Sequence, residues 1–198
     1  MANGRVVLYD LWTYGHHVKY VRYLASHLLQ AGYEVAFVTL RKQPSIELEL
    51  ADLPQLHIEY VAPDAKATTA RDPVRLFLHQ WKALTLCFRF AARWRATHVC
   101  IMYLDYGELP LLARSLLWRG RSWRLFGFLI WPYWSRTGLK EVTWAKRAYR
   151  LLRRSALRWL LKSGHMDCAF VHTEWAKNTL GDAGGANAWL EERVLVGA

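Results

Sequence analysis

The chain has 198 residues, enough to bury a hydrophobic core as one domain or as one half of a two-domain enzyme. Its formal net charge of +11 is concentrated in residues 81–162, where 17 Lys and Arg residues stand against 3 acidic residues, a balance of +14. This block predicts an anionic partner: a phosphate-bearing ligand, an anionic lipid surface or a nucleic acid. The longest apolar run, Leu125–Trp134, is about half as long as a membrane span, and no apolar segment precedes the first predicted strand. Neither a transmembrane helix nor a signal peptide is therefore predicted.

The N-terminal forty residues predict a strand–helix–strand unit. Arg5–Tyr9 is a short apolar run, and apolar residues between positions 18 and 29 recur at steps of three and four, as on one face of a helix. Gly32 is placed to end this helix in the left-handed conformation. Glu34–Leu40 is then a mostly apolar, β-branched run, typical of a strand covered on both faces. A unit of this length crosses over right-handed and joins parallel strands.

Strands and helices keep alternating along the rest of the chain. The predicted elements are a short helix at 45–50, an edge-like strand at 57–62, a helix from 72–73 to about 94, a strand at 98–104, a helix at 108–117, a strand at 124–131, a long helix at 139–162 closed by Gly164, a strand at 168–172, a short helix at 174–180 and a strand at 193–196. We therefore expect one α/β domain over residues 1–198. Its sheet should be doubly wound, mostly parallel and Rossmann-like, with about six to seven strands and helices on both faces.

The cysteines point to packing rather than to chemistry. Cys87, Cys100 and Cys168 lie far apart, form no Cys-x-x-Cys pair, and two of them fall in predicted strands. We expect buried, reduced thiols, which favours a reducing cytoplasm. No ligand spacing suits zinc and no Gly-x-Ser-x-Gly motif occurs, so neither a metal site nor a serine hydrolase is predicted.

Three short motifs follow one another in a characteristic order. The first is Gly15-His16 in the loop after the first strand, followed by Leu24-Ala25, Leu28 and Gly32-Tyr33-Glu34-Val35; the second is Asp167 to Trp175 followed by Leu180; the third is Arg193 to Gly197. Together they resemble the N-terminal, acceptor-side domain of GT-B glycosyltransferases over essentially the whole chain. Tyr33 replaces the His that is usual in the family.

The resemblance implies the acceptor-binding half of a glycosyltransferase. A nucleotide-sugar would be the co-substrate, without a tightly bound cofactor, and the donor-binding C-terminal domain is absent from these 198 residues. The chain is then either a fragment of a longer enzyme or a subunit that works with a separate donor-binding chain, and it is expected to be inactive alone. We expect the chain in the cytoplasm, either free or attached to the inner face of the membrane.

Two other interpretations stay open. One is a non-catalytic subunit that docks a partner transferase to a membrane. The other is a basic nucleic-acid-binding α/β module, which the charge permits although no recognition motif is present; we therefore expect no specific nucleic acid.

Residues after the first and fourth strands are candidates for catalysis. The resemblance implies that His16 is the general base for an acceptor hydroxyl in inverting enzymes, and that Asp105 orients it. The structural alternative makes His16 a hydrogen-bonding residue at the helix start and Asp105 an N-cap. A retaining enzyme needs no such base, so the stereochemical outcome stays open.

Other residues near the same edge of the sheet are candidates for substrate binding. Gly15 lets a phosphate or a sugar approach the backbone N–H groups at the helix start, and aromatic rings stack on sugar or lipid surfaces. The alternative for Gly15 is a tight turn that needs glycine. The alternative for the aromatic residues is packing under the edge of the sheet, and the alternative for Thr173 and Glu174 is stabilising the start of a helix. The candidates are Gly15, His17, Asp10, Trp131, Tyr133, Thr173 and Glu174.

The predicted helix at 139–162 carries an apolar stripe and a basic stripe. The stripe expected to face the core is Val142, Ala145, Tyr149, Leu152, Ala156 and Trp159. Two leucines are expected to project outward among the arginines, an arrangement that suits an anionic membrane surface, where each basic side chain contributes about 1 kcal/mol. A solvated basic face is the alternative. The residues of this expected membrane surface are Arg147, Arg150, Arg154, Arg158, Leu157 and Leu161.

Overall fold

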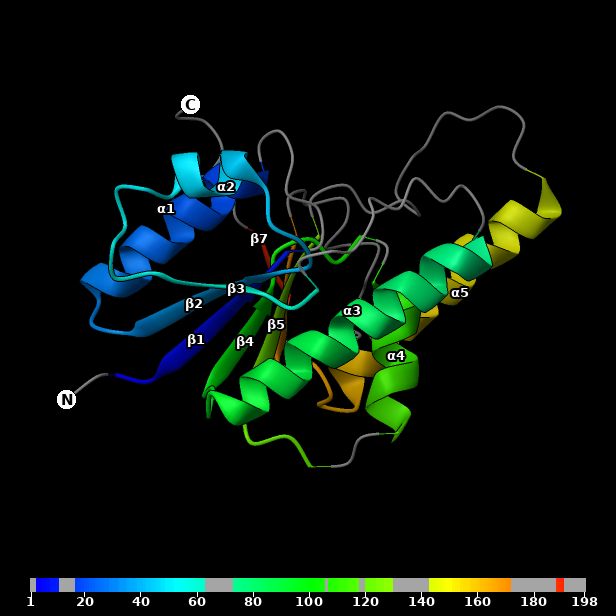
Figure 1. Ribbon diagram of the computed structural model, residues 1–198. Helices are drawn as coiled ribbons and strands as arrows, with labels where there is room; N and C mark the ends of the chain where they lie inside the picture. Colours follow the sequence, from blue (N-terminus) through cyan, green and yellow to red (C-terminus); the bar gives the residue numbers. More distant parts are fainter. Residues whose placement is uncertain are drawn as a thin grey trace.

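The computed structural model describes residues 3–10, 17–62, 73–105, 107–117, 120–129, 143–171 and 188–190. These ranges form a seven-stranded sheet in the order β3-β2-β1-β4-β5-β6-β7, in which every neighbouring pair is parallel. The strands are β1 (Arg5–Tyr9), β2 (Glu34–Thr39), β3 (His57–Tyr60), β4 (His98–Ile101), β5 (Arg124–Leu129), β6 (Cys168–Val171) and β7 (Ala188–Leu190). The helices are α1 (His17–Gln30), α2 (Pro44–Glu49), α3 (Pro73–Arg93), α4 (Glu108–Leu117) and α5 (Trp144–Lys162) (Figure 1). The predicted doubly wound, Rossmann-like α/β fold is confirmed.

Each face of the sheet has its own hydrophobic core. Successive side chains of a strand point to opposite faces, and in β1 Val7 and Tyr9 join the core under α3, α4 and α5, whereas Val6 and Leu8 join the core under α1 and α2. Figure 1 shows these two groups of helices on opposite sides of the sheet. Because parallel crossovers are right-handed, this division follows from the reversal of strand order between β1 and β4. Open α/β sheets bind ligands beyond the carboxyl ends of the strands at such a reversal.

Most predicted elements are present with small shifts at their ends. Gly32, with φ of 81°, adopts the left-handed conformation predicted after α1, and Gly164, predicted to close the long helix, is also left-handed, with φ of 70°. Helix α5 begins at Trp144 rather than at 139, preceded by the non-helical Thr143. The predicted helix at 174–180 and strand at 193–196 lie outside the described residues, and the strand paired with β6 is β7 instead.

The three thiols are buried and none is in a disulfide, as predicted. Burial raises the pKa of Cys87 and Cys100 well above the ordinary thiol value, and burial together with Asp167 raises the pKa of Cys168 to about 11. Each sulfur therefore stays protonated near neutral pH and packs as a small apolar group.

Helix α5 turns a different face to the core than the sequence predicts. Leu157 and Leu161 are 0% and 2% exposed and pack against the sheet, so the expectation that they project among the arginines is wrong. Leu152 and Trp159, expected in the core, are exposed instead. Leucines lie on two sides of the helix, so either side could face the core. Arg153 forms a buried ion pair, and the side of the helix that carries it therefore faces inward.

Gly127 in β5 is packed too closely for a larger side chain. A Cβ atom there would lie 2.8 Å from Leu104 Cδ2 and 3.0 Å from Met166 Cε, and both residues are fully buried. Gly127→Ala is therefore expected to lower the free energy of unfolding by about 1–3 kcal/mol, measured by urea denaturation. Ser155→Ala, on the exposed side of α5, is the control. An equal denaturation midpoint for both variants would contradict the inference that Gly127 leaves no room for a side chain.

Candidate functional site

The candidate site lies beyond the carboxyl ends of β1 and β4, where the strand order reverses. Asp10 directly follows β1, and its backbone N–H donates to Val38 O at 3.2 Å. His17 is the first residue of α1. From β4 the chain continues through Tyr103 to Asp105 before α4 begins. Asp10, His17 and Asp105 thus lie on the segments that follow β1 and β4, at the edge where parallel sheets place their ligands.

Asp10 and His17 form a buried pair. Their side chains are 2% and 7% exposed, and His17 Nδ1 lies 3.0 Å from Asp10 Oδ2. The ring of Tyr103 packs edge-on against His17, with 4.7 Å between the ring centroids. An ionised Asp10 accepts the proton on Nδ1, so the neutral imidazole carries its lone pair on Nε2. The pair therefore has the arrangement of a general base with an orienting carboxylate.

Asp105 lies beside a second buried cluster. It is fully buried, and Arg153 of α5 contributes a positive charge near it. Arg153 Nε and Nη2 donate to Glu108 Oε2 at 3.0 and 2.8 Å, and Nη2 also lies 2.8 Å from Glu108 Oε1. Burial lowers the pKa of Arg153, but Glu108, Tyr149 and Asp105 together raise it by more, so the net shift is upward. This ion pair fixes the start of α4, and so the loop that contains Asp105, against α5.

The structure brings together two of the predicted site residues, Asp10 and His17, and places Asp105 beside Arg153. It pairs Asp10 with His17, whereas the sequence suggested His16 with Asp105. The sequence reasoning missed Tyr103 and the Glu108–Arg153 pair. One signal pointed to the pair: Glu108 is one of only 3 acidic residues in a block with 17 basic ones. The candidates that lie outside the described residues are Gly15, His16, Trp131, Tyr133, Thr173 and Glu174.

Among the described residues, no group of three or more His, Cys, Asp or Glu side chains is arranged to hold a metal ion. His17 Nδ1 and Asp10 Oδ2 are in hydrogen-bond contact, a geometry suited to proton transfer.

The solvent side of α5 is the second distinctive surface. Its four large apolar residues, which we call the α5 outer face, are Trp144, Leu151, Leu152 and Trp159, with 82%, 61%, 54% and 38% of their surface exposed. Arg147 is exposed beside them, and Arg154 and Arg158 are half-buried along the same flank. Within the described ranges, no helix is both long and apolar enough to cross a bilayer. The α5 outer face therefore combines exposed apolar and basic groups on one helix.

Comparison with known proteins gives no match in sequence and clear matches in structure. No protein-family model and no curated protein sequence match the chain. Sucrose-phosphate synthase from Thermosynechococcus elongatus superposes with a TM-score of 0.54 at 15% identity, over 93% of this chain and 85% of that one.

Two further structures match with equal quality. Phytolacca americana UGT2, complexed with UDP-2fluoro-glucose and pterostilbene, gives a TM-score of 0.53 at 13% identity, over 87% of this chain and 48% of that one. Arabidopsis thaliana UGT89C1, complexed with quercetin, gives 0.54 at 12% identity, over 97% and 50%. The chain thus spans about half the length of these two proteins. These similarities show that the chain has the Rossmann-like fold of a GT-B glycosyltransferase domain.

Proposed function

We propose that the chain is the acceptor-binding half of a glycosyltransferase that moves a sugar from a nucleotide-sugar to an acceptor hydroxyl. The observation that carries the proposal is the buried Asp10–His17 pair at the carboxyl edge of a GT-B sheet. The half-length match to UGT2, which was solved with UDP-2fluoro-glucose and pterostilbene, supports a donor-binding partner or second domain elsewhere. The proposal applies equally to a fragment and to a separate subunit.

In the proposed reaction, His17 Nε2 takes the proton of the acceptor hydroxyl. The acceptor oxygen then attacks the anomeric carbon, and the nucleotide diphosphate leaves with the electron pair of the broken C–O bond. Asp10 stabilises the imidazolium that forms and keeps the ring in the required tautomer. This assigns to His17 and Asp10 the roles that the sequence suggested for His16 and Asp105. His16 and Asp105 stay candidates for positioning the acceptor.

A reconstitution assay tests the proposal with a cell extract as the source of the acceptor. An extract from cells that lack the gene is mixed with radiolabelled nucleotide-sugars, with and without the purified product of the whole gene, so that a donor-binding half encoded by the same gene is also present. The gene product is expected to restore transfer of label to one class of product. If it restores no labelled product with any common nucleotide-sugar, although the cell that carries the gene makes one, the proposed function is wrong.

We further propose that the α5 outer face rests on an anionic membrane surface, as in a peripheral protein of the cytoplasmic membrane face. Exposed tryptophans and leucines beside arginines suit the lipid headgroup region, where apolar burial and attraction to anionic lipid act together. In this proposal Leu151 and Leu152 of the α5 outer face contact the membrane, in place of the predicted Leu157 and Leu161. Arg147, Arg154 and Arg158 keep their predicted part, whereas the predicted Arg150 is half-buried with its Nε and Nη2 covered and is not included in this surface.

Liposome sedimentation tests this surface. The chain is expected to sediment with vesicles that contain phosphatidylglycerol and much less with purely zwitterionic ones. The double variant Leu151→Ser and Leu152→Ser should weaken binding by at least about tenfold, because two exposed leucines no longer enter the lipid. Leu48→Ser is the matched control, since Leu48 is 82% exposed on α2, across the sheet. Equal binding by the double variant and the control would contradict the proposal that the α5 outer face binds the membrane.

A further inference from the structure

Tyr103 lies just beyond the carboxyl end of β4, and the chain is anchored on both sides of it. The backbone N–H of Met102 donates to Tyr9 O in β1 at 2.8 Å. The backbone N–H of Leu104 donates to Phe128 O in β5, also at 2.8 Å. The side chains of Met102 and Leu104 are buried in the cores on opposite faces of the sheet. The sheet itself therefore fixes the backbone position of Tyr103.

The ring of His17 is contacted by both Asp10 and Tyr103. Nδ1 lies 3.0 Å from Asp10 Oδ2, and the Tyr103 ring meets the imidazole at 64° with 4.7 Å between the centroids. The torsion that turns a histidine ring has broad minima, so a hydrogen bond at Nδ1 alone lets the ring swing. A second ring that meets the imidazole at a steep angle narrows this swing. The two contacts together fix the direction in which Nε2 points.

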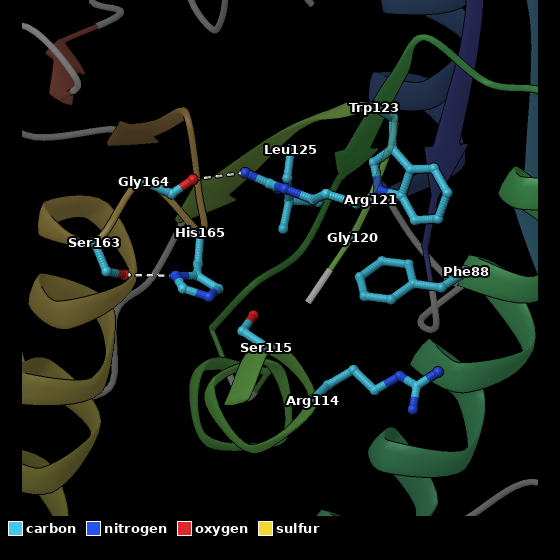
Figure 2. Close-up of a pocket in the computed structure, with 10 residues that line it drawn as sticks. All are labelled: Phe88, Arg114, Ser115, Gly120, Arg121, Trp123, Leu125, Ser163, Gly164 and His165. Carbon is cyan, nitrogen blue, oxygen red and sulfur yellow. Dashed lines mark hydrogen bonds between the residues drawn. The ribbon is translucent and has the colours of Figure 1, made fainter. Parts of the chain in front are cut away.

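A ring pair at the opposite edge of the sheet shows the contrast with a purely structural contact. Phe88 and Trp123, with 5.9 Å between their centroids, lie beside a cavity of about 340 Å³ at the amino-terminal end of β5 (Figure 2). Both residues are 5% exposed and belong to the hydrophobic core, so their contact stabilises the fold. Tyr103 is only half-buried, and its partner is the polar His17 beside a carboxylate. This contact therefore belongs to the candidate site.

We propose that Tyr103 is a positioning residue, which holds the His17 imidazole with Nε2 toward the acceptor hydroxyl. The inference rests on the proposed function, in which Nε2 takes the acceptor proton. A general base must lie within about 2.6–3.2 Å of the hydroxyl oxygen, and a misplacement of about 1 Å can lower a rate by about 10²-fold. In this role Tyr103 transfers no proton and acts only through His17.

Tyr103→Leu tests this role, and Tyr33→Leu is the matched control. Tyr33 also forms a steep ring pair with a histidine: it meets His98 at 88° with 6.3 Å between the centroids, at the amino-terminal edge of the sheet. In the transfer assay with the whole gene product, Tyr103→Leu is expected to lower kcat by about 10- to 100-fold. The KM for the nucleotide-sugar should change little, and Tyr33→Leu should leave kcat unchanged.

The conservative variant Tyr103→Phe separates the ring from the hydroxyl group. It keeps the ring that contacts the imidazole, so it should keep most of the wild-type kcat. If Tyr103→Phe loses as much activity as Tyr103→Leu, the ring contact is not the cause and the proposal is wrong. Equal kcat for Tyr103→Leu and Tyr33→Leu would also overturn it.

A double variant shows whether Tyr103 acts through His17. The His17→Ala chain has no imidazole left to orient, so adding Tyr103→Leu should cause no further loss of transfer. A further loss of about tenfold or more would show that Tyr103 acts on another group, against the proposal. Urea denaturation checks that each variant is folded. If Tyr103→Leu does not fold, Tyr103→Met removes the ring with a more adaptable side chain, and the same loss is expected.

The same measurements separate this inference from the proposed function. Slow transfer by His17→Ala together with normal transfer by Tyr103→Leu would overturn the role of Tyr103 alone. Normal transfer by His17→Ala would overturn the proposed base, and the role of Tyr103 with it.

Discussion

Replacing His17 by alanine is expected to lower the rate of sugar transfer by about 10²–10⁴-fold, the usual contribution of a general base. The imidazole is buried against Asp10, and alanine removes the group that is proposed to take the acceptor proton without changing the sheet. The reconstituted transfer assay measures the loss, with labelled product formed per minute as the readout. The Michaelis constant for the nucleotide-sugar should change little, because the proposed function places the donor contacts in another half.

Two further variants separate catalysis from folding. Asp10→Asn keeps the shape of the pair but removes the charge that stabilises the imidazolium, so it should also slow transfer while the chain stays folded. His27→Ala is the control, because His27 lies on the same helix, exposed, with Nδ1 2.9 Å from Tyr23 O. Near-normal transfer by His17→Ala would remove His17 from the mechanism.

Replacing Arg153 by methionine is expected to lower the free energy of unfolding by about 3–5 kcal/mol. The guanidinium and the Glu108 carboxylate are 1% and 0% exposed, and they share three contacts of 2.8–3.0 Å. Methionine fills the same space but leaves the Glu108 charge buried without its partner, with Asp105 also buried nearby. Urea denaturation at neutral pH measures the change.

The double variant Arg153→Met and Glu108→Met distinguishes an unpaired charge from lost packing. With both charged groups gone, most of the stability should return, since a buried ion pair and an apolar pair of similar volume have similar stability. Arg22→Met is the surface control: its partner Asp52 is exposed, and the midpoint should stay nearly unchanged. A double variant as unstable as Arg153→Met alone would show that the ion pair is not the cause.

The fold could be predicted from the sequence because its signals are local. The apolar run of β1, the periodicity of α1 and the left-handed Gly32 each report on a few neighbouring residues. Alternation of such units leaves few arrangements once right-handed crossovers are required. The bounds of β1 and α4 could therefore be predicted to the residue.

The site could be predicted only in part because its contacts are not local. Neighbouring His16 and His17 are equivalent in sequence, and nothing in the sequence shows that the side chain of His17 pairs with Asp10. The inward face of α5 could not be predicted because Arg153 looks, in the sequence, like one more surface charge. Its partner Glu108 lies 45 residues away, and no helical pattern shows that separation.

Removal of the gene tests most directly whether the carboxyl edge of this sheet serves sugar transfer. Small molecules and lipids from cells with and without the gene are compared by mass spectrometry. One glycosylated compound should disappear while the same compound without its sugar accumulates, and the wild-type gene should reverse both changes where the His17→Ala gene does not. Unchanged glycosylated compounds, or full reversal by the His17→Ala gene, would contradict the account.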